Sequence, residues 1–391
     1  MRIENIKIIE ANNWVKIKAD VVWAKNNPQE VFYAVPKNYK SSLDKEYADN
    51  FVVGLLLLAV NNNENIFLDN IKISPTLRKN IETNLIPILA QMKCGNNKTK
   101  IISNKDNSFD QWRGRDVGTG ISLGVDSFYS ILKYKNDKKM PIKCVLYIKQ
   151  IKDWSCNIDR VAYEEIKKRK EVADKLGLKF IPILSNLRNI MDTEFVFSQY
   201  HTFAHLSAAL TIKDIGCYYY ATGFSENEMS LKLSDTAYYD NYIKEALKHE
   251  NFNLKLAGED VTRFQKTYLI KTDKVVQKYL EVCLYPITSE NKIKNCTKCH
   301  KCNRTLATFE VLKCLSDFKD VFDIESYIEN RGRVWGEIEY GRIIMKDEFL
   351  VEIFKKAREV NIKLPLMRWY FFVVIGIKNQ LNKIKRLSSR I

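Results

Sequence analysis

The sequence lacks any apolar run long enough to cross a membrane. Its two most apolar stretches, residues 51–60 and 369–377, are well short of the roughly 20 residues that a spanning helix needs. The first residues contain no apolar segment typical of secretion signals, so we expect no signal peptide. Nine cysteines are an odd number, and four of them fall into one metal-like pattern. This usage favours a reducing compartment. Together, these features predict a cytoplasmic protein without a transmembrane segment.

Several common catalytic signatures are also missing. No Gly-Lys-Ser/Thr motif of the Walker phosphate loop occurs, and no glycine-rich dinucleotide fingerprint is found. Ser, His and Asp do not occur in an order and context typical of a hydrolase triad. The chemistry of the chain therefore has to rest on other patterns.

The charge is strongly unbalanced, with 63 Lys and Arg against 47 Asp and Glu and a net charge of +16. Such a balance is compatible with nucleic acid, an anionic membrane surface or anionic small ligands. The excess is mostly lysine spread along Asn- and Ile-rich sequence, so a nucleic-acid partner stays open but is not favoured. The densest basic segment is 378–390, with five cationic side chains and no acids.

The most informative segment is residues 120–127, which read Gly-Ile-Ser-Leu-Gly-Val-Asp-Ser. Small residues let backbone N–H groups approach an anion closely. The helix expected to follow, as far as about Lys135, adds its positive dipole end. The segment therefore predicts a phosphate-binding turn between a strand and a helix. Asp126 is also suited to cap this helix, and the two roles are compatible.

Residues 122–127 resemble the SGGxDS loop of the PP-loop ATP pyrophosphatases. This superfamily includes asparagine synthetase domains, tRNA thiolases and 7-cyano-7-deazaguanine synthases. Its loop wraps the pyrophosphate end of ATP, and its enzymes release pyrophosphate after adenylating a carbonyl oxygen. The resemblance implies that four residues contact ATP phosphates and Mg²⁺, namely Ser122, Gly124, Asp126 and Ser127. Leu123 departs from the pattern, because this position is usually glycine.

A second pattern lies downstream, where four cysteines are spaced C-x12-C-x2-C-x2-C: Cys283, Cys296, Cys299 and Cys302. Four thiolates can close a tetrahedral zinc site, and such sites stabilise loops that lack a core of their own. Neighbouring cations would offset the negative charge of this centre, namely Lys292, Lys294, Lys298, Lys301 and Arg304. The sequence favours structural zinc. An iron–sulfur cluster and free or disulfide-forming thiols stay open.

A PP-loop followed by a late four-cysteine site resembles the 7-cyano-7-deazaguanine synthase-like proteins, over about residues 115–315. In those enzymes a structural zinc lies just beyond the nucleotide domain and is followed by a helix that carries an arginine. Arg304 opens the corresponding helix in this chain. The nitrile-forming pocket of the family is not recognisable, so only the nucleotide and zinc sites are carried over.

The middle of the chain alternates strands and helices. Four strands are predicted, at 117–122, 142–148, 178–184 and 217–222, with helices that include 158–176 and 201–212. This alternation predicts an α/β fold, a parallel sheet with helices on both faces, and ligands at the carboxyl ends of its strands. The resemblance implies the adenine-nucleotide alpha-hydrolase-like form of that fold, in a PP-loop domain spanning residues 106–285.

The two ends of the chain differ from this middle region. Residues 1–105 predict an α+β domain, with a hairpin turned at Asn12-Asn13, a buried helix at 48–60 and a helix at 75–92. Residues 283–315 form the four-cysteine element. Residues 316–391 predict a basic helical extension with helices at 317–330, 347–359 and 364–387. The last of these is suited to lie on a membrane or RNA, or to pack on the domain or a partner subunit.

Further candidate residues follow the predicted strands. Thr222 and Gly223 come after the fourth strand and are expected to face the same crevice as the phosphate loop, contacting ATP. Asp153 follows the second strand and is a candidate for a ribose or acceptor contact. By family resemblance, Lys266 and the nearby Arg263 are candidates for neutralising charge in the transition state. Four more residues stay ambiguous between substrate, metal and structural roles: His201, His205, Asp235 and Asp240.

The leading hypothesis is an ATP-dependent ligase-type enzyme in which Asp126, Lys266 and Arg263 carry the catalytic work. It adenylates a carboxylate or amide oxygen of a small-molecule or peptide acceptor, with Mg²⁺, and releases pyrophosphate. A nitrogen nucleophile then displaces AMP to give an amide or nitrile. One alternative is ATP-dependent sulfur insertion, with a persulfide on Cys156, Cys217 or a metal-site cysteine. The other is a zinc-containing RNA-binding protein with a degenerate loop. Whether the chain forms a homodimer stays open.

Overall fold

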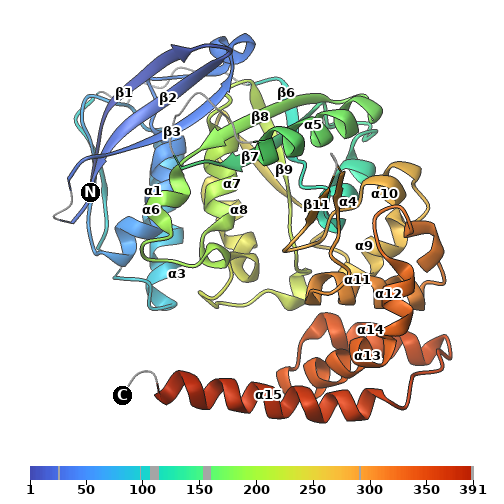
Figure 1. Ribbon diagram of the computed structural model, residues 1–391. Coiled ribbons are helices and arrows are strands. Elements are labelled where there is room, and N and C mark those ends of the chain that lie inside the picture. Colours follow the sequence, from blue (N-terminus) through green and yellow to red (C-terminus); the bar gives the residue numbers. More distant parts are fainter. Residues whose placement is uncertain (25–26, 97, 106–113, 153–159, 290–291, 389–391) are drawn as a thin grey trace. The chain divides into compact units, whose positions relative to one another are not determined.

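The computed structural model describes residues 1–391 except 25–26, 97, 106–113, 153–159, 290–291 and 389–391 (Figure 1). The chain forms two compact units. Unit 1 comprises Met1–Ser122 and Ser130–Asp260, and unit 2 comprises Leu123–Tyr129 and Val261–Ile391. Helix α4 (Val125–Tyr134) therefore has its first residues in unit 2 and its remainder in unit 1.

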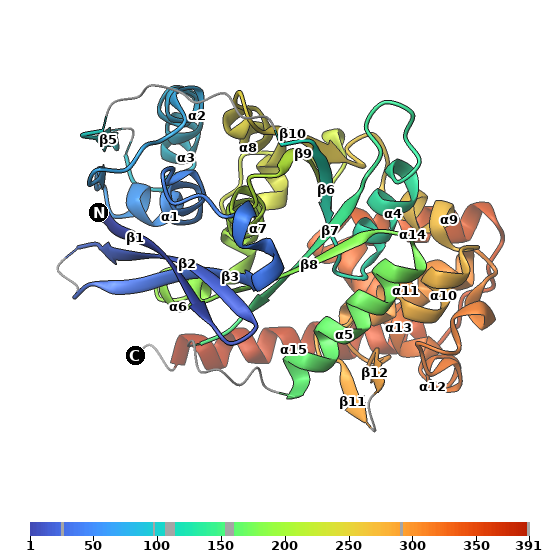
Figure 2. The ribbon, with the colours of Figure 1, turned by 90° about the horizontal axis from the view of Figure 1, so that it is seen from above.

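Unit 1 is built on one ten-stranded sheet in the order β10-β9-β6-β7-β8-β3-β2-β1-β4-β5 (Figure 2). Five neighbouring strands run parallel: β10 (Asn253–Ala257), β9 (Ile215–Ala221), β6 (Asp116–Gly120), β7 (Cys144–Gln150) and β8 (Lys179–Ser185). Three strands then run antiparallel: β3 (Gln29–Pro36), β2 (Trp14–Val22) and β1 (Arg2–Ala11). Two short strands pair in parallel beyond β1: β4 (Ile66–Leu68) and β5 (Ile101–Ser103).

The predicted α/β class is confirmed, and the sheet is longer and more mixed than predicted. Pairing of Tyr33 with Ser185 joins β3 to β8, so the strands of residues 1–105 extend the sheet of the α/β segment. The domain boundaries at residues 105 and 285 stay predictions. Numbered along the chain, the five parallel strands lie in the order 3-2-1-4-5, the order of doubly wound sheets. That order reverses between β6 and β9, which makes their carboxyl ends the switch point.

Helices cover both faces of this sheet, as predicted. Strand β3 shows the division, because Val31, Tyr33 and Val35 join the main core whereas Phe32 and Ala34 face the opposite side. The main core is covered by α1 (Asp49–Asn61), α2 (Pro75–Asn80), the π-helical turn η2 (Ile81–Leu85), α3 (Ile86–Gln91), α6 (Leu187–Met191), α7 (His201–Leu210) and α8 (Asp240–Leu247). On the opposite face, α5 (Arg160–Lys175) contributes Ile166 beside Phe32 and Leu184. Four 3-10 turns complete the unit: η1 (Lys37–Ser42), η3 (Phe197–Gln199), η4 (Glu226–Glu228) and η5 (Thr236–Tyr239).

Local signals in unit 1 predicted its elements well. The helix expected at 48–60 is α1, which is buried on nearly all sides. The hairpin turns at Asn12-Asn13, and Asn12 takes the left-handed conformation that asparagine tolerates (φ 52°). The helix expected at 75–92 is interrupted by the π-helical turn, just before Pro87 at the start of α3. Proline has no backbone N–H to donate to the helix, which accounts for the change from α-helical to π-helical hydrogen bonding at this point.

In its described residues, unit 2 is helical apart from one antiparallel pair of short strands. Its elements are α9 (Arg263–Ile270), α10 (Lys274–Tyr279), β11 (Ile287–Ser289), β12 (Lys292–Lys294), α11 (His300–Val311), η6 (Leu315–Phe318), α12 (Ile324–Glu329), α13 (Arg331–Tyr340), η7 (Gly341–Met345), α14 (Glu348–Glu359) and α15 (Arg368–Ser388). Helix α13 was not predicted. Its Gly332 and Gly336 disfavour a helix locally, but they let Phe371 of α15 pack closely against it. Among the described residues, no helix combines the length and apolarity that crossing a membrane requires.

Candidate functional site

The candidate loop begins in unit 1 at the end of β6. Ser122 is exposed, and its carbonyl oxygen accepts a hydrogen bond from Arg169 Nη2 at 3.4 Å. Arg169 is 4% exposed, and its guanidinium lies 4.4 Å from the centre of the Tyr147 ring. Sequence reasoning missed this residue. The sequence did contain a signal for it. Arg169 lies three and four residues before the buried Val172 and Ala173 of α5, a spacing that places all three on the same face of the helix.

Leu123, the first loop residue of unit 2, has a left-handed backbone. Its φ is 64°, and its side chain is fully buried. This is the position where the resembled family usually has glycine. A left-handed conformation costs a side-chain-bearing residue roughly 1–2 kcal/mol. Glu281 donates its backbone N–H to the Leu123 carbonyl at 2.8 Å, which ties the loop to the segment that leads into the four-cysteine element.

The predicted group Asp126, Arg263 and Lys266 is brought together in unit 2. Asp126 lies in the first turn of α4, and its Oδ2 is 2.7 Å from Arg263 Nη1. Its Oδ1 is 3.7 Å from Nζ of Lys266, whose side chain is fully buried. Both cations lie on α9, so the position of that helix sets the geometry of the group.

A capping box fixes where α9 begins. The Thr262 side chain accepts the N–H of Gln265, and the Gln265 side chain accepts the N–H of Thr262. This reciprocal pair satisfies two N–H groups at the start of the helix. Thr262 also donates to Glu352 Oε1 of α14 at 2.6 Å. The start of α9, and with it Arg263, is therefore held from two sides.

Two more cations come from α11 in the same unit. The charges of Lys301 and Arg304 both act on Asp126. Burial, and after it the neighbouring Arg263, lowers the pKa of Arg304 to about 10. Burial and the two arginines lower the pKa of Lys301. Asp347 also attracts the charge of Arg304, more strongly than Asp126 does, so four cations share two carboxylates. This arrangement is unfavourable by itself and suited to a multiply charged anion.

The remaining residues predicted to contact ATP are divided between the two units. Gly124 accepts the N–H of Phe128 at 3.0 Å, and Ser127 is 4% exposed, both in unit 2. Thr222 and Gly223 belong to unit 1, at the carboxyl end of β9. A Cβ added to Gly223 would come no closer than 4.0 Å to Ala237. Because β6 and β9 are neighbours, Ser122 and Thr222 follow adjacent strands at the same edge of the sheet.

Thr222 is also part of a buried polar network in unit 1. Its hydroxyl donates to Asp240 Oδ2 at 3.0 Å, and Thr202 donates to the other oxygen of Asp240 at 2.8 Å. Asp240 is 1% exposed, and burial raises its pKa to about 6 even though His201 and the two hydroxyl donors oppose the shift. His201 bridges Tyr220 at 3.1 Å and Asp235 at 2.9 Å through its two ring nitrogens. His205 is only partly buried and contacts the network through the edge of the Tyr220 ring, and burial and the nearby His201 lower its pKa to about 4.

The four predicted metal ligands are brought together in unit 2. Their sulfur atoms all lie within 4.8 Å of one another. The Sγ distances are 3.9 Å for Cys283–Cys299, 3.9 Å for Cys296–Cys302 and 3.5 Å for Cys299–Cys302. Four sulfurs around one tetrahedral ion with bonds of about 2.3 Å lie about 3.8 Å apart. The cluster can therefore hold one metal ion.

Backbone donors support these thiolates. Lys298 and Cys299 donate N–H groups to Cys296 Sγ at 3.4 and 3.3 Å. Burial opposes ionisation, but these donors, together with the thiols of Cys283 and Cys299, outweigh it and lower the pKa of Cys296 to about 7. Asn295 holds the ligand segment, since its side-chain oxygen accepts the N–H groups of Val282 and Cys283. The site thus has the outer shell of donors that metal centres require.

Other predicted residues do not join a described site. Cys217 is buried in β9, and burial raises its pKa, so its thiol is poorly suited to carry a transferable sulfur. Asp153 and Cys156 lie outside the described residues.

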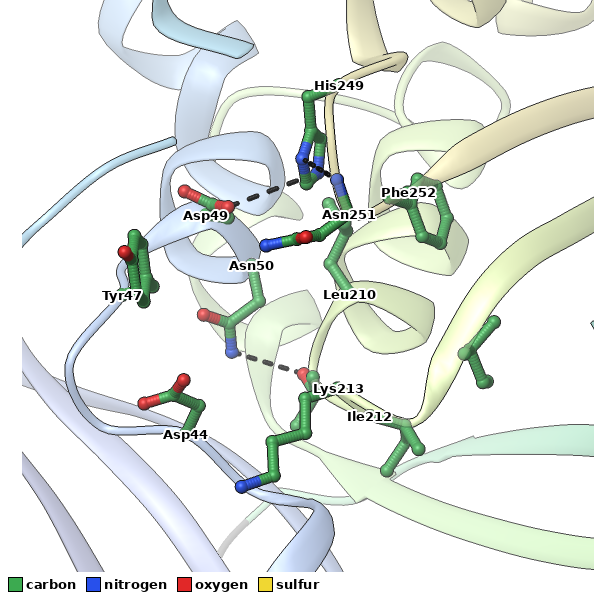
Figure 3. A pocket seen from close by; sticks show the side chains of 12 residues that line it. Asp44, Tyr47, Asp49, Asn50, Leu210, Ile212, Lys213, His249, Asn251 and Phe252 are labelled. Carbon is green, nitrogen blue, oxygen red and sulfur yellow. Dashed lines mark hydrogen bonds and ion pairs between the residues drawn. The ribbon is translucent and has the colours of Figure 1, made fainter. Parts of the chain in front are cut away.

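A small cavity of about 30 Å³, with polar and apolar lining residues, lies elsewhere in unit 1, at the amino end of α1 (Figure 3). Asp49, Asn50, His249 and Asn251 line it, and all four are buried. His249 Nε2 lies 4.0 Å from Asp49 Oδ2. In the described structure, neither His249 Nε2 nor Asn251 Oδ1 has a hydrogen-bond partner. A water molecule has both the size and the donor and acceptor groups that these atoms require.

Three comparisons with known proteins identified no relative of the chain. A scan against protein-family models, a search of curated proteins and a search of solved structures each found no match to the chain.

Proposed function

We propose that the chain is an ATP-dependent enzyme of the ligase type. The proposal rests above all on one observation, the four cations gathered around Asp126 at the start of α4. Two arginines and two lysines against the carboxylates of Asp126 and Asp347 leave two positive charges, beside a helix end that itself favours anions. A triphosphate is one common metabolite group that such an excess of positive charge attracts.

The doubly wound strand order of unit 1, taken by itself, also favours ligand binding. Ligands of such sheets bind beyond the carboxyl ends of the strands at the switch point, where Ser122 and Thr222 follow β6 and β9. Asp126 would hold Mg²⁺ together with phosphate oxygens, since its Oδ1 has no hydrogen-bond partner in the described structure. Bound there, Mg²⁺ would supply charge neutralisation of the phosphates.

The proposed reaction is adenylation of a carboxylate or amide oxygen, with release of pyrophosphate and then attack by a nitrogen nucleophile. The resemblance to PP-loop enzymes suggests this order. Arg263 and Lys266 would stabilise the charge that develops on the departing pyrophosphate, through preorganised contacts rather than covalent help. Lys266 is suited to this task because its side chain is fully buried, so the protein rather than solvent holds its ammonium group in place.

The metal in the four-cysteine element is proposed to be a single structural zinc ion. An iron–sulfur cluster of four irons places each thiolate on a separate metal, which spreads the sulfurs further than a shared ion does. Sulfur atoms that all lie within 4.8 Å of one another favour one ion. Four protein ligands leave no open position, so this zinc would have no catalytic role.

Pyrophosphate release from ATP and Mg²⁺, measured over a panel of small carboxylic acids, tests the proposed function. We expect release with at least one acid and a loss of at least tenfold in Asp126→Ala. Equal release from wild type and variant would remove Asp126 from the reaction. If calorimetry detects no ATP binding, and RNA binds with an affinity that falls steeply with salt, the RNA-binding alternative replaces the proposal.

A further inference from the structure

We infer that helix α14, in the C-terminal extension, completes the phosphate site through Phe349. This inference rests on the proposed function and assigns a positioning residue outside the segment that resembles PP-loop enzymes. Phe349 lies in the first turn of α14, and all the groups that it concerns belong to unit 2.

Phe349 contacts both arginines of the cationic cluster. The Arg304 guanidinium carbon is 4.5 Å from the centre of the Phe349 ring, and that of Arg263 is 5.9 Å away. Both distances are within the range of cation–π attraction. One aromatic ring thus attracts two guanidiniums that repel each other.

A second contact anchors the same helix. Glu352 lies three residues after Phe349, on the same face of α14, and accepts the hydrogen bond from Thr262. Thr262 is the N-cap of α9 and immediately precedes Arg263. The two contacts therefore fix the arginine at both its backbone and its side chain.

The ring, together with the carboxylates of Asp126 and Asp347, explains why the arginines stay close without a bound phosphate. Asp126 pairs with only one of them directly, at 2.7 Å from Arg263. Arg304 instead has the aromatic face. The charges of Asp347 and Asp126 also attract Arg304, but in the described structure it donates no hydrogen bond to either carboxylate. A ring attracts a cation without forming strong directional hydrogen bonds, so the N–H groups of Arg304 stay suited to phosphate oxygens.

Helix α14 also offers a matched control. Phe354 lies five residues further along and pairs with Arg342 at 3.8 Å, another cation–π contact in the same unit. Neither Phe354 nor Arg342 lies among the residues around Asp126. Phe354→Leu removes an equivalent contact from the same helix and leaves the phosphate cluster intact.

The test is calorimetric titration of the full chain with pyrophosphate. We expect Phe349→Leu to weaken binding about fivefold, which corresponds to about 1 kcal/mol. Phe349→Tyr keeps the ring and is expected to bind within twofold of wild type, as is Phe354→Leu. Unchanged affinity in Phe349→Leu would overturn the inference, and so would equal weakening in Phe354→Leu.

Arginine reactivity separates this inference from the proposed function. With phenylglyoxal and peptide mass spectrometry, Arg304 is expected to react faster in Phe349→Leu than in wild type or Phe354→Leu. This readout needs no nucleotide. If wild type binds neither pyrophosphate nor ATP, the proposed function fails and the inference fails with it. If wild type binds and Arg304 reactivity does not change, only the inference fails.

Discussion

The sheet of unit 1 and the loop–metal region of unit 2 are stabilised by different means. Unit 1 buries a large apolar core, in which α1 alone contributes an almost continuous series of fully buried side chains. The region around Asp126 and the four cysteines is held by ion pairs and backbone hydrogen bonds, and its four clustered sulfurs could hold a metal ion. Apolar burial is spread over many contacts, whereas each polar contact is specific. Single substitutions should therefore have larger and more localised effects in unit 2.

Loss of one metal ligand should be the most damaging of these changes. Cys299→Ala removes a sulfur that lies 3.9 and 3.5 Å from two other ligands. Structural zinc sites contribute about 10 kcal/mol or more of binding free energy. We expect loss of bound zinc and faster hydrogen exchange at Glu281 N–H, which bonds Leu123. Far-UV circular dichroism from unit 1 should persist.

The control for that experiment is Cys314→Ala, because Cys314 is a buried cysteine of unit 2 outside the cluster. It should retain one zinc per chain by elemental analysis. Full zinc retention in Cys299→Ala would contradict the assignment of the site.

The next largest difference between the two units should be in the stability lost when a charged side chain is removed. Asp126→Ala leaves the buried Lys266 and the neighbouring arginine without this carboxylate, and we expect a loss of about 3 kcal/mol in unfolding free energy. Glu30 in unit 1 also pairs with two cations, Lys16 at 2.5 Å and Lys18 at 2.8 Å, but its side chain is 33% exposed. Glu30→Ala should cost about 1 kcal/mol or less. Urea denaturation of both variants measures the difference, and equal losses would refute it.

Local sequence patterns predicted what local physics determines. The apolar series of α1, the Asn-Asn turn and the cysteine spacing each act within a few residues, so they could be read directly. Pairing of β3 with β8 joins residues about 150 positions apart, and no local signal encodes it. Helix α13 forms despite Gly332 and Gly336, because tertiary packing outweighs their low helix propensity.

The candidate site divides in the same way. Asp126, Arg263 and Lys266 were predicted because a motif and a family resemblance pointed to them. Lys301 was noticed only as a neighbour of the cysteines, and Arg304 also as the arginine of the helix that follows them in the resembled family; the structure brings the charges of both to Asp126. Arg169 and Phe349 were missed, because an arginine on an apolar stripe and a phenylalanine in an amphipathic helix both resemble ordinary packing residues.

The buried carboxyl of Asp240 should make the free energy of unfolding of unit 1 depend on pH. Its folded pKa of about 6 lies above the ordinary value of 3.8, so the folded state holds its proton more tightly than the unfolded state. Stability from this group is present at low pH and is lost as pH rises towards 6. Between pH 5 and 7.5 the wild type should lose roughly 1.5 kcal/mol that Asp240→Asn does not lose. Urea denaturation at both pH values tests this, and parallel pH profiles would disprove it.

The smallest predicted effect is a difference in backbone strain between two buried leucines, one in each unit. Leu123 has a φ of 64°, whereas Leu55 lies inside helix α1, and both side chains are fully buried. Alanine and glycine delete either side chain almost equally, so their difference isolates the backbone. At Leu55 glycine should be about 1 kcal/mol less stable than alanine, because it loses more conformational freedom in a helix. At Leu123 the sign should reverse by about 1 kcal/mol, because only glycine relieves the left-handed strain. Thermal denaturation of the four variants measures both differences, and the same sign at both positions would show that Leu123 carries no strain.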